Sequence, residues 1–290
     1  MIDLSLTICV PVYNWDVQPL VEALLLQVEK SAIPCHILIV DDASTVDLPS
    51  ITSSDFVEVV RLDVNLGRSG VRNFMVKHSQ TSHVLFIDGD CLVGEDFVKT
   101  YVDKLLTNDD AVICGGLVYP EKWEDDHSRL RYMYGVTHEV VELEARRGKP
   151  YASFKTSNFL APRMLMLNIS FDERLAQYGH EDTLFGLQLR QNGESIVHID
   201  APVVHLGLES NEVFLEKTEM ALDNLFTLFT RYPQLFSSDK INILSKGLFR
   251  NPISVLWARM NARRLKNRAL TKADVKAFQL YKLTYALMNR

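Results

Sequence analysis

Short apolar runs alternate with amphipathic helical stretches over the first 90 residues of this chain. Four runs rich in apolar and β-branched residues are typical of buried strands: Leu6–Val12, His36–Val40, Val57–Leu62 and Val84–Ile87. Two intervening stretches, Val17–Lys30 and Ser69–His78, have the spacing of helices. This alternation predicts βαβ units and a mostly parallel sheet flanked by helices. Since ligands bind beyond the carboxyl ends of such strands, the residues that follow each run are candidates for function.

Polar residues follow all four runs, and we expect them to lie along one edge of the sheet. The motifs are Pro-Val-Tyr-Asn from Pro11, Asp-Asp-Ala-Ser from Asp41, Asn-Leu-Gly-Arg from Asn65 and Asp-Gly-Asp from Asp88. Asp88 and Asp90, separated by Gly89, can face a hard cation such as Mg²⁺ or Mn²⁺. Alone, Asp-Gly-Asp is typical of a turn. Its position in line with three other polar strand ends favours a site.

Beyond residue 90 the sequence pattern changes several times along the chain. After a strand at 112–118 we expect an irregular charged stretch, 119–149, and then a helix that follows the sequence Tyr-Gly-His-Glu-Asp and ends at Gly193. A last strand, about 195–206, carries His198 and His205. From Asn211 the pattern is helical, with breaks at Tyr232-Pro233 and Asn251-Pro252. We predict a catalytic domain at 1–210, with a donor-binding half at about 1–118 and an acceptor-binding half at about 119–210, and a helical extension at 211–290.

Composition is that of a globular protein, with 47% hydrophobic and 23% charged residues in 290. The sequence starts without a basic segment followed by an apolar run, and no stretch of about 18 apolar residues occurs, so we expect a cytoplasmic protein that spans no membrane. Its cysteines lie in or beside apolar runs without C-x-x-C spacing, which predicts reduced, buried thiols and neither disulfides nor a zinc site. They are Cys9, Cys35, Cys91 and Cys114.

Charge is unevenly distributed. Residues 246–290 hold eleven Lys or Arg against one acid, Asp274, for a net +10, which leaves −16 on the rest of a chain whose total is −6. Nucleic acid needs clustered basic residues on the domain that binds it, so the acidic body argues against a nucleic-acid partner.

The basic tail contains a cationic amphipathic pattern over 247–268. One interpretation is peripheral contact with the inner face of a membrane, since such helices lie on anionic bilayers. The other is that the apolar face packs on the catalytic domain or on a second subunit of a homo-oligomer while the arginines face solvent.

Seven motifs together resemble those of the family 2 glycosyltransferases, over about residues 4–207. They are CVPVYN, VDDAS, NLGRSGVRN, FIDGDC, FDERL, YGHEDTLFGLQLRQNG and VVHLG. The resemblance implies the Rossmann-like GT-A fold and an inverting transferase of the hexosyl or N-acetylhexosaminyl class. It implies a nucleotide-sugar donor, usually a UDP-sugar, with Mn²⁺ or Mg²⁺ and no organic cofactor. The acceptor implied is a hydroxyl of a glycan or lipid-linked glycan, in cell-surface polysaccharide or glycoconjugate synthesis.

On the donor side, the resemblance implies that Pro11 and Tyr13 border the nucleobase and that Asp41 or Asp42 accepts a hydrogen bond from it. Both aspartates are also typical of helix caps and turns. Arg68 and Arg72 resemble the residues that approach the base and diphosphate, although either is also compatible with a solvated helix start.

In the Asp-Gly-Asp loop, the resemblance makes Asp88 the ribose-side carboxylate, beside Gly89, and Asp90 the metal ligand. His205 resembles the distant histidine that completes the metal site, and the alternative is a histidine of the core. His198 fits that motif less well.

On the acceptor side, Asp182 resembles the general base that takes the acceptor proton, and Glu181 the neighbour that helps to bind the acceptor. Acids in the first turn of a helix also complement its dipole. His180 stands where a related GGED-like segment has its second glycine, so the sugar specificity of that subgroup does not transfer. The chain also lacks the Q-x-x-R-W segment of processive synthases, which favours addition of one or few sugars.

Two other functions are compatible with a nucleotide-binding sheet. A sugar-nucleotide pyrophosphorylase should begin with a glycine-rich loop that carries a lysine, and CVPVYN has neither residue. A catalytically inactive nucleotide-sugar-binding protein has no need of Asp90, Asp182 and His205, which are all present.

Overall fold

The computed structural model describes residues 4–47, 49, 51, 54–175, 179–235 and 252–289. The chain divides into two compact units. The first comprises Met1–Pro120, Val140–Ala176 and Glu181–Gly207, and the second comprises Glu121–Glu139, Gln177–His180 and Leu208–Arg290. The second unit thus takes in a segment from the middle of the sequence. The domain boundaries given above remain predictions.

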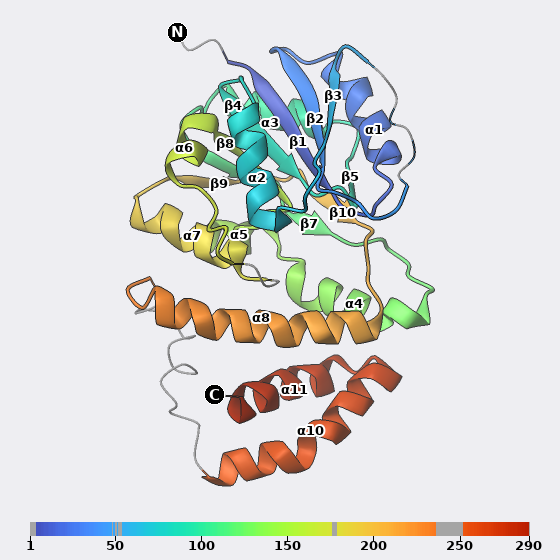
Figure 1. Ribbon diagram of the computed structural model, residues 1–290. Helices are drawn as coiled ribbons and strands as arrows, with labels where there is room; N and C mark the ends of the chain where they lie inside the picture. Colours follow the sequence, from blue (N-terminus) through green and yellow to red (C-terminus); the bar gives the residue numbers. More distant parts are fainter. Residues whose placement is uncertain are drawn as a thin grey trace. The chain divides into compact units, whose positions relative to one another are not determined.

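The first unit is built on a large sheet with the strand order β3-β2-β1-β4-β8-β6-β9 in the described residues (Figure 1). Its strands are β1 Leu6–Val12, β2 Cys35–Asp41, β3 Val57–Arg61, β4 His83–Ile87, β6 Val112–Cys114, β8 Asn158–Pro162 and β9 Ile196–His198. Strands β3, β2, β1 and β4 are parallel, β6 is parallel to β9, and β8 runs antiparallel to both of its neighbours. The predicted mostly parallel sheet is confirmed.

A small sheet of the first unit has the order β5-β10-β7, with β5 Cys91–Leu92, β7 Leu117–Val118 and β10 Val203–His205. The expected single strands at 112–118 and 195–206 are therefore wrong, because each divides between the two sheets. Gly115 and Gly116 break the first of them. Gly116 has a φ of +96°, which favours glycine, and a Cβ on Gly115 would overlap the carbonyl of Ala201.

Helices cover both faces of the large sheet: α1 Gln18–Val28, α2 Gly67–His78, α3 Phe97–Leu105, α5 Leu143–Gly148, α6 Arg163–Asn168 and α7 Glu181–Gln191. Because side chains alternate along a strand, Ile8 and Val10 pack with α1 and α3, whereas Cys9 packs in the cluster that contains α2, α6 and α7. Helix α7 is followed by Gly193 at φ +74°, so the predicted glycine stop is confirmed.

The second unit is helical, with α4 Arg129–Tyr134 between η1 Asp126–Ser128 and η2 Gly135–Glu139, then α8 Asn211–Arg231, α10 Pro252–Lys272 and α11 Val275–Met288. Leu130, Phe214 and Phe278 lie in its core. The hydroxyl of Ser210 caps α8. The stretch 119–149, expected to be irregular, contains the short helices α4 and α5. No helix in the described ranges is long and apolar enough to cross a membrane.

All four cysteines are described, and they are buried free thiols, as the sequence predicts. Burial raises the pKa of Cys9, Cys35 and Cys114 to about 12, which keeps these thiols protonated at neutral pH.

Candidate active site

The polar strand ends meet at one edge of the sheet, as expected, because β1, β2 and β4 are parallel neighbours. They surround a cavity of about 170 Å³ whose lining is Pro11, Val12, Tyr13, Trp15, Asp42, Arg68, Val71, Arg72, Asp88, Gly89 and Asp90. Eight of the twelve candidate residues line it. The other four are Asp41, Glu181, Asp182 and His205.

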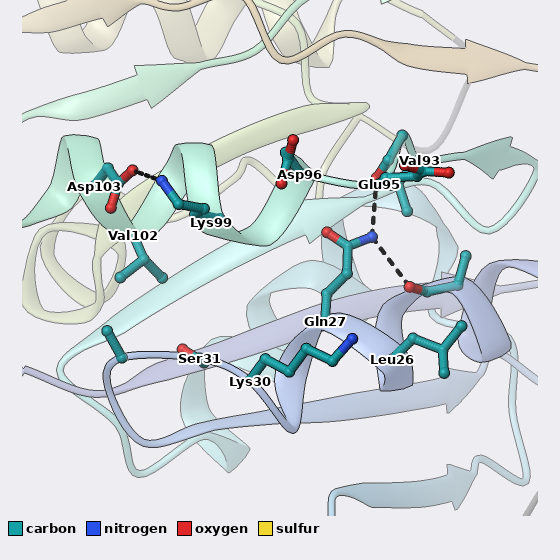
Figure 2. A pocket seen from close by; sticks show the side chains of 13 residues that line it. Leu26, Gln27, Lys30, Ser31, Val93, Glu95, Asp96, Lys99, Val102 and Asp103 are labelled. Atoms are coloured by element: carbon teal, nitrogen blue, oxygen red, sulfur yellow. Dashed lines mark hydrogen bonds and ion pairs between the residues drawn. The ribbon is translucent and has the colours of Figure 1, made fainter.

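A larger cavity, of about 570 Å³, lies between α1 and α3 (Figure 2). The amide of Gln27 bridges its two sides, because Nε2 donates to the Gly94 carbonyl (2.9 Å) and Oε1 accepts from Val98 N (3.0 Å). No candidate residue lines this cavity. The smaller cavity is the candidate active site, since strand-end carboxylates and arginines gather there.

Asp41 and Asp42, at the end of β2, hold the loops that follow β2 and β3. Asp42 accepts hydrogen bonds from the backbone N–H groups of Leu66 (2.6 Å) and Gly67 (3.0 Å), where α2 begins. Burial raises the pKa of Asp42 despite these bonds. Asp41 accepts a bond from Ser44 N (2.9 Å) and does not line the cavity. Both side chains therefore have a structural contact, and only Asp42 also reaches the cavity.

Arg72 is a buried cation in the cavity wall, 2% exposed. Its Nη2 lies 2.5 Å from Asp88 Oδ1, and its Nη1 donates to the carbonyl of Arg68 (2.9 Å). Its Nε is buried without a hydrogen-bond partner within the described residues. An unpaired buried donor costs about 1–3 kcal/mol, so a ligand oxygen that reached Nε would recover this energy.

Asp90 and His205 meet although they are far apart in the sequence. Strand β10 pairs with β5 so that His205 lies opposite Cys91, and His205 Nε2 is 3.3 Å from Asp90 Oδ2. Burial of the Asp90 carboxyl opposes its ionisation, but the hydrogen bond with His205 and the charges of His205 and Arg68 outweigh burial and lower its pKa. Gly207 passes so close that a Cβ there would overlap the Asp90 carboxylate.

A divalent cation fits this pair of side chains. A carboxylate oxygen and an imidazole nitrogen suit Mn²⁺, and Asp90 Oδ2 and His205 Nε2 lie 3.3 Å apart, close enough for both atoms to face one ion. The described residues contain no group of three or more His, Cys, Asp or Glu that could hold a metal. The chain would thus supply two ligands, and diphosphate oxygens of a donor are suited to complete the coordination.

Glu181 and Asp182 open helix α7. Glu181 Oε1 lies 3.3 Å from Nη1 of Arg68, which ties it to the cavity wall. Asp182 Oδ2 lies 2.9 Å from Lys155 Nζ, and Oδ1 accepts from Thr183 N (2.7 Å). The first acid is thus linked to the cavity through Arg68, and the second is held by a lysine.

His198 has different surroundings from His205. It is 2% exposed in β9, with Nε2 3.0 Å from the Pro150 carbonyl and Nδ1 3.3 Å from Arg146 Nη1. Burial lowers its pKa, and the charge of Arg146 acts in the same direction. His198 is a buried structural residue away from the cavity.

Some residues at the site were missed by the sequence argument. Trp15 lines the cavity one residue beyond the CVPVYN motif, so a longer motif would have included it. Tyr119 sets its ring edge against His205, with 5.6 Å between centroids. Lys155 lies 27 residues from Asp182 and has no motif of its own. No sequence signal predicts the pairing of Lys155 with Asp182.

Comparison with known proteins agrees with the fold. The mannosyltransferase PcManGT from Pyrobaculum calidifontis, in complex with GDP-Man and Mn²⁺, is similar over 98% of this chain and 86% of its own, with a TM-score of 0.59 and 17% identity. The structure of S. aureus TarS 1-349 in complex with UDP-GlcNAc is similar over 98% of this chain and 90% of its own, with a TM-score of 0.50 and 17% identity. No curated protein sequence matches the chain.

A family model provides the assignment. The model described as glycosyl transferase family 2 matches residues 7–174, more than half of the 290 residues, and this range contains the strand-end motifs of the cavity. The predicted GT-A fold, with its mostly parallel central sheet and C-terminal helices, is confirmed. This chain belongs to the family 2 glycosyltransferases.

Proposed function

We propose that this protein is an inverting transferase that moves a hexosyl or N-acetylhexosaminyl group from a nucleotide sugar, a UDP-sugar first among them, to a hydroxyl of a glycan or lipid-linked glycan. The observation that carries the proposal is the meeting of Asp90 and His205 beside the cavity, 3.3 Å apart. The same cavity presents Arg68 and Arg72, which suit a diphosphate. Such a transferase would act in polysaccharide or glycoconjugate synthesis.

The cavity offers the groups that a donor needs. Tyr13, half exposed, can stack on a nucleobase next to Pro11, and the carboxylate of Asp88 can accept hydrogen bonds from ribose hydroxyls. Asp42 can accept one from the base through lone pairs that its backbone contacts leave open. Gly89 lets the loop after β4 pass close to β1, because a Cβ there would lie 3.0 Å from the Pro11 carbonyl.

Asp90 and His205 would hold the divalent cation, Mn²⁺ or Mg²⁺. When bound, the cation neutralises negative charge on the departing diphosphate. Arg68 lies near enough to Asp90 to lower the pKa of that carboxyl, so its charge would also act on the phosphates.

Asp182 would act as the general base, with Glu181 beside it to orient the acceptor. The acceptor hydroxyl gives its proton to the Asp182 carboxylate, its oxygen bonds to C1 of the sugar, and the bond from C1 to the diphosphate oxygen breaks with its electron pair. A single displacement inverts the configuration at C1, so no carboxylate nucleophile is required to form a covalent glycosyl intermediate. Lys155, 2.9 Å from Asp182, would hold the base in place.

A donor panel tests the proposal. The purified protein is heated with UDP-, GDP- and dTDP-sugars, each with Mn²⁺ or EDTA, and the melting temperature and nucleotide release are measured. GDP-Man and UDP-GlcNAc belong in the panel because the two fold relatives hold them. A metal-dependent rise in melting temperature with slow nucleotide release is expected. Release of pyrophosphate from a sugar phosphate and a nucleoside triphosphate would instead indicate a pyrophosphorylase, and donor binding without turnover an inactive binding protein.

A further inference from the structure

Helix α10 packs through one narrow face of small and apolar residues. Along the helix these residues are spaced by four, three and four positions, so they lie on one side: Ala258, Ala262, Leu265 and Ala269. Ala258 and Ala269 are fully buried, and Ala262, Leu265 and Ala269 belong to the core shared with α11. Helix α10 therefore packs against the rest of its unit through this face.

The opposite face of α10 is also apolar in its first half. Ile253 is 80% exposed, Leu256 59%, Trp257 44% and Met260 75%. Their spacing of three, one and three residues places them in one stripe, about half a turn of the helix away from Ala258. We call these four residues the apolar stripe. Four large apolar side chains exposed next to one another mark a surface that binds a partner.

Positive charge continues the stripe along the helix. Arg263 and Arg264 occupy the same face one turn further on, and Arg259 lies at its border. These three arginines form no ion pair with any carboxylate in the described ranges, whereas Lys266 is paired with Glu219 in the same unit. Residues 252–289 carry eight Lys or Arg against one acid, a net +7, in a chain of net −6.

We infer that α10 is a docking surface for an anionic lipid bilayer. The apolar stripe would enter the boundary between headgroups and acyl chains, with Trp257 at the depth that tryptophan prefers, while Arg263 and Arg264 contact lipid phosphates. A two-fold dimer through the same face would offer these arginines no carboxylate, because residues 252–272 contain no Asp or Glu. Charge therefore favours a lipid surface over a second copy of this chain.

Vesicle sedimentation with the full chain tests the inference. The protein is mixed with vesicles of phosphatidylcholine alone or with one third phosphatidylglycerol, at low and high salt. We expect binding to the anionic vesicles only, weakened by salt. Ile253→Ser with Met260→Ser, and separately Arg263→Glu with Arg264→Glu, should each weaken binding at least about tenfold. The assay needs neither donor nor acceptor, so its result is independent of catalysis.

Matched controls keep the test specific. Leu26→Ser with Met164→Ser removes two apolar residues that are 64% and 62% exposed in the other unit. Lys30→Glu with Lys77→Glu makes the same charge change on exposed lysines. Both pairs should bind like the wild type.

Tryptophan fluorescence adds a readout specific to one residue. Vesicles should shift the emission of the wild type to the blue, and Trp257→Phe should lose most of this shift while it still sediments with anionic vesicles. Equal binding to neutral vesicles, no binding at all, or unchanged binding of both α10 variants would overturn the inference. A dimer that the stripe variants dissociate, with no vesicle binding by the wild type, would overturn it and assign the stripe to a second copy.

Discussion

Arg68 on the wall of the small cavity lies 3.3 Å from Glu181 at the start of α7, which links the proposed donor and acceptor sides of the site. Arg68→Ala and Glu181→Ala should each lower kcat/KM, and the double variant should be less impaired than the product of the two effects. The Arg68 side chain is half exposed, so solvent screens the pair and a coupling of about 0.5–1 kcal/mol is expected. A double-mutant cycle measures it. The exposed pair Lys99 and Asp103 is the control, and strict additivity at Arg68 and Glu181 would refute the link.

Asp90→Asn should abolish the metal dependence of donor binding. The amide has no charge to attract the cation, and one of two protein ligands is weakened. Titration of the donor with Mn²⁺ or EDTA, followed by thermal shift, measures the effect, and His205→Ala should act in the same direction. Asp110→Asn changes an exposed carboxylate and serves as the control. Metal-dependent binding that survives in Asp90→Asn would remove this residue from the metal site.

Asp182→Asn should leave donor binding intact and lower kcat by about 10²–10⁴-fold, the usual contribution of a general base. The amide keeps the shape of the side chain, so α7 should fold normally. Donor affinity by calorimetry and transfer by nucleotide release separate the two effects. If the variant transfers sugar at the rate of the wild type, the base lies elsewhere.

Gly207→Ala should damage the metal site and also cost some stability. The added Cβ would overlap both the carboxylate and the Cβ of Asp90, so rotation of that side chain cannot relieve the clash and the backbone must shift, which separates Asp90 from His205. Metal affinity should then fall, and the melting temperature without metal should fall with it. Gly148→Ala, where no atom lies within 4 Å of the new Cβ, is the control. Equal metal affinity in both variants would show that the approach of Gly207 to Asp90 is unimportant.

Stability should decrease below about pH 6.5. Burial lowers the pKa of His36, His83 and His198 below the ordinary value of 6.5, so these imidazoles stay neutral in the folded chain as the pH falls. The unfolded chain then binds more protons, and each such histidine removes up to about 1.4 kcal/mol of unfolding free energy per pH unit. Urea unfolding between pH 7.5 and 5 measures the slope. His198→Gln should reduce it and exposed His127→Gln should not, and equal slopes would contradict the mechanism.

The sequence predicted which strand ends meet at one edge of the sheet, because local pattern determines them. Periodicity over a few residues is enough to predict each strand, the polar residues at its end and its parallel pairing. Pro11, Asp42 and Asp88 could therefore be placed at one edge of the sheet. The division of 195–206 into two strands was missed, since a short run of apolar residues does not reveal which sheet it joins. Contacts such as Lys155 with Asp182 depend on tertiary packing and leave no periodic signal.

The pairing of β10 with β5 determines when the contact between Asp90 and His205 can form. The loop with Asp88 and Asp90 is translated 115 residues before His205, and the two are brought together by the short pairing of β10 with β5. A growing chain therefore carries the Asp90 carboxylate without its histidine partner until residue 205 has been added. Since non-local contacts form late in folding, the contact between Asp90 and His205 should be among the last parts of the candidate site to form.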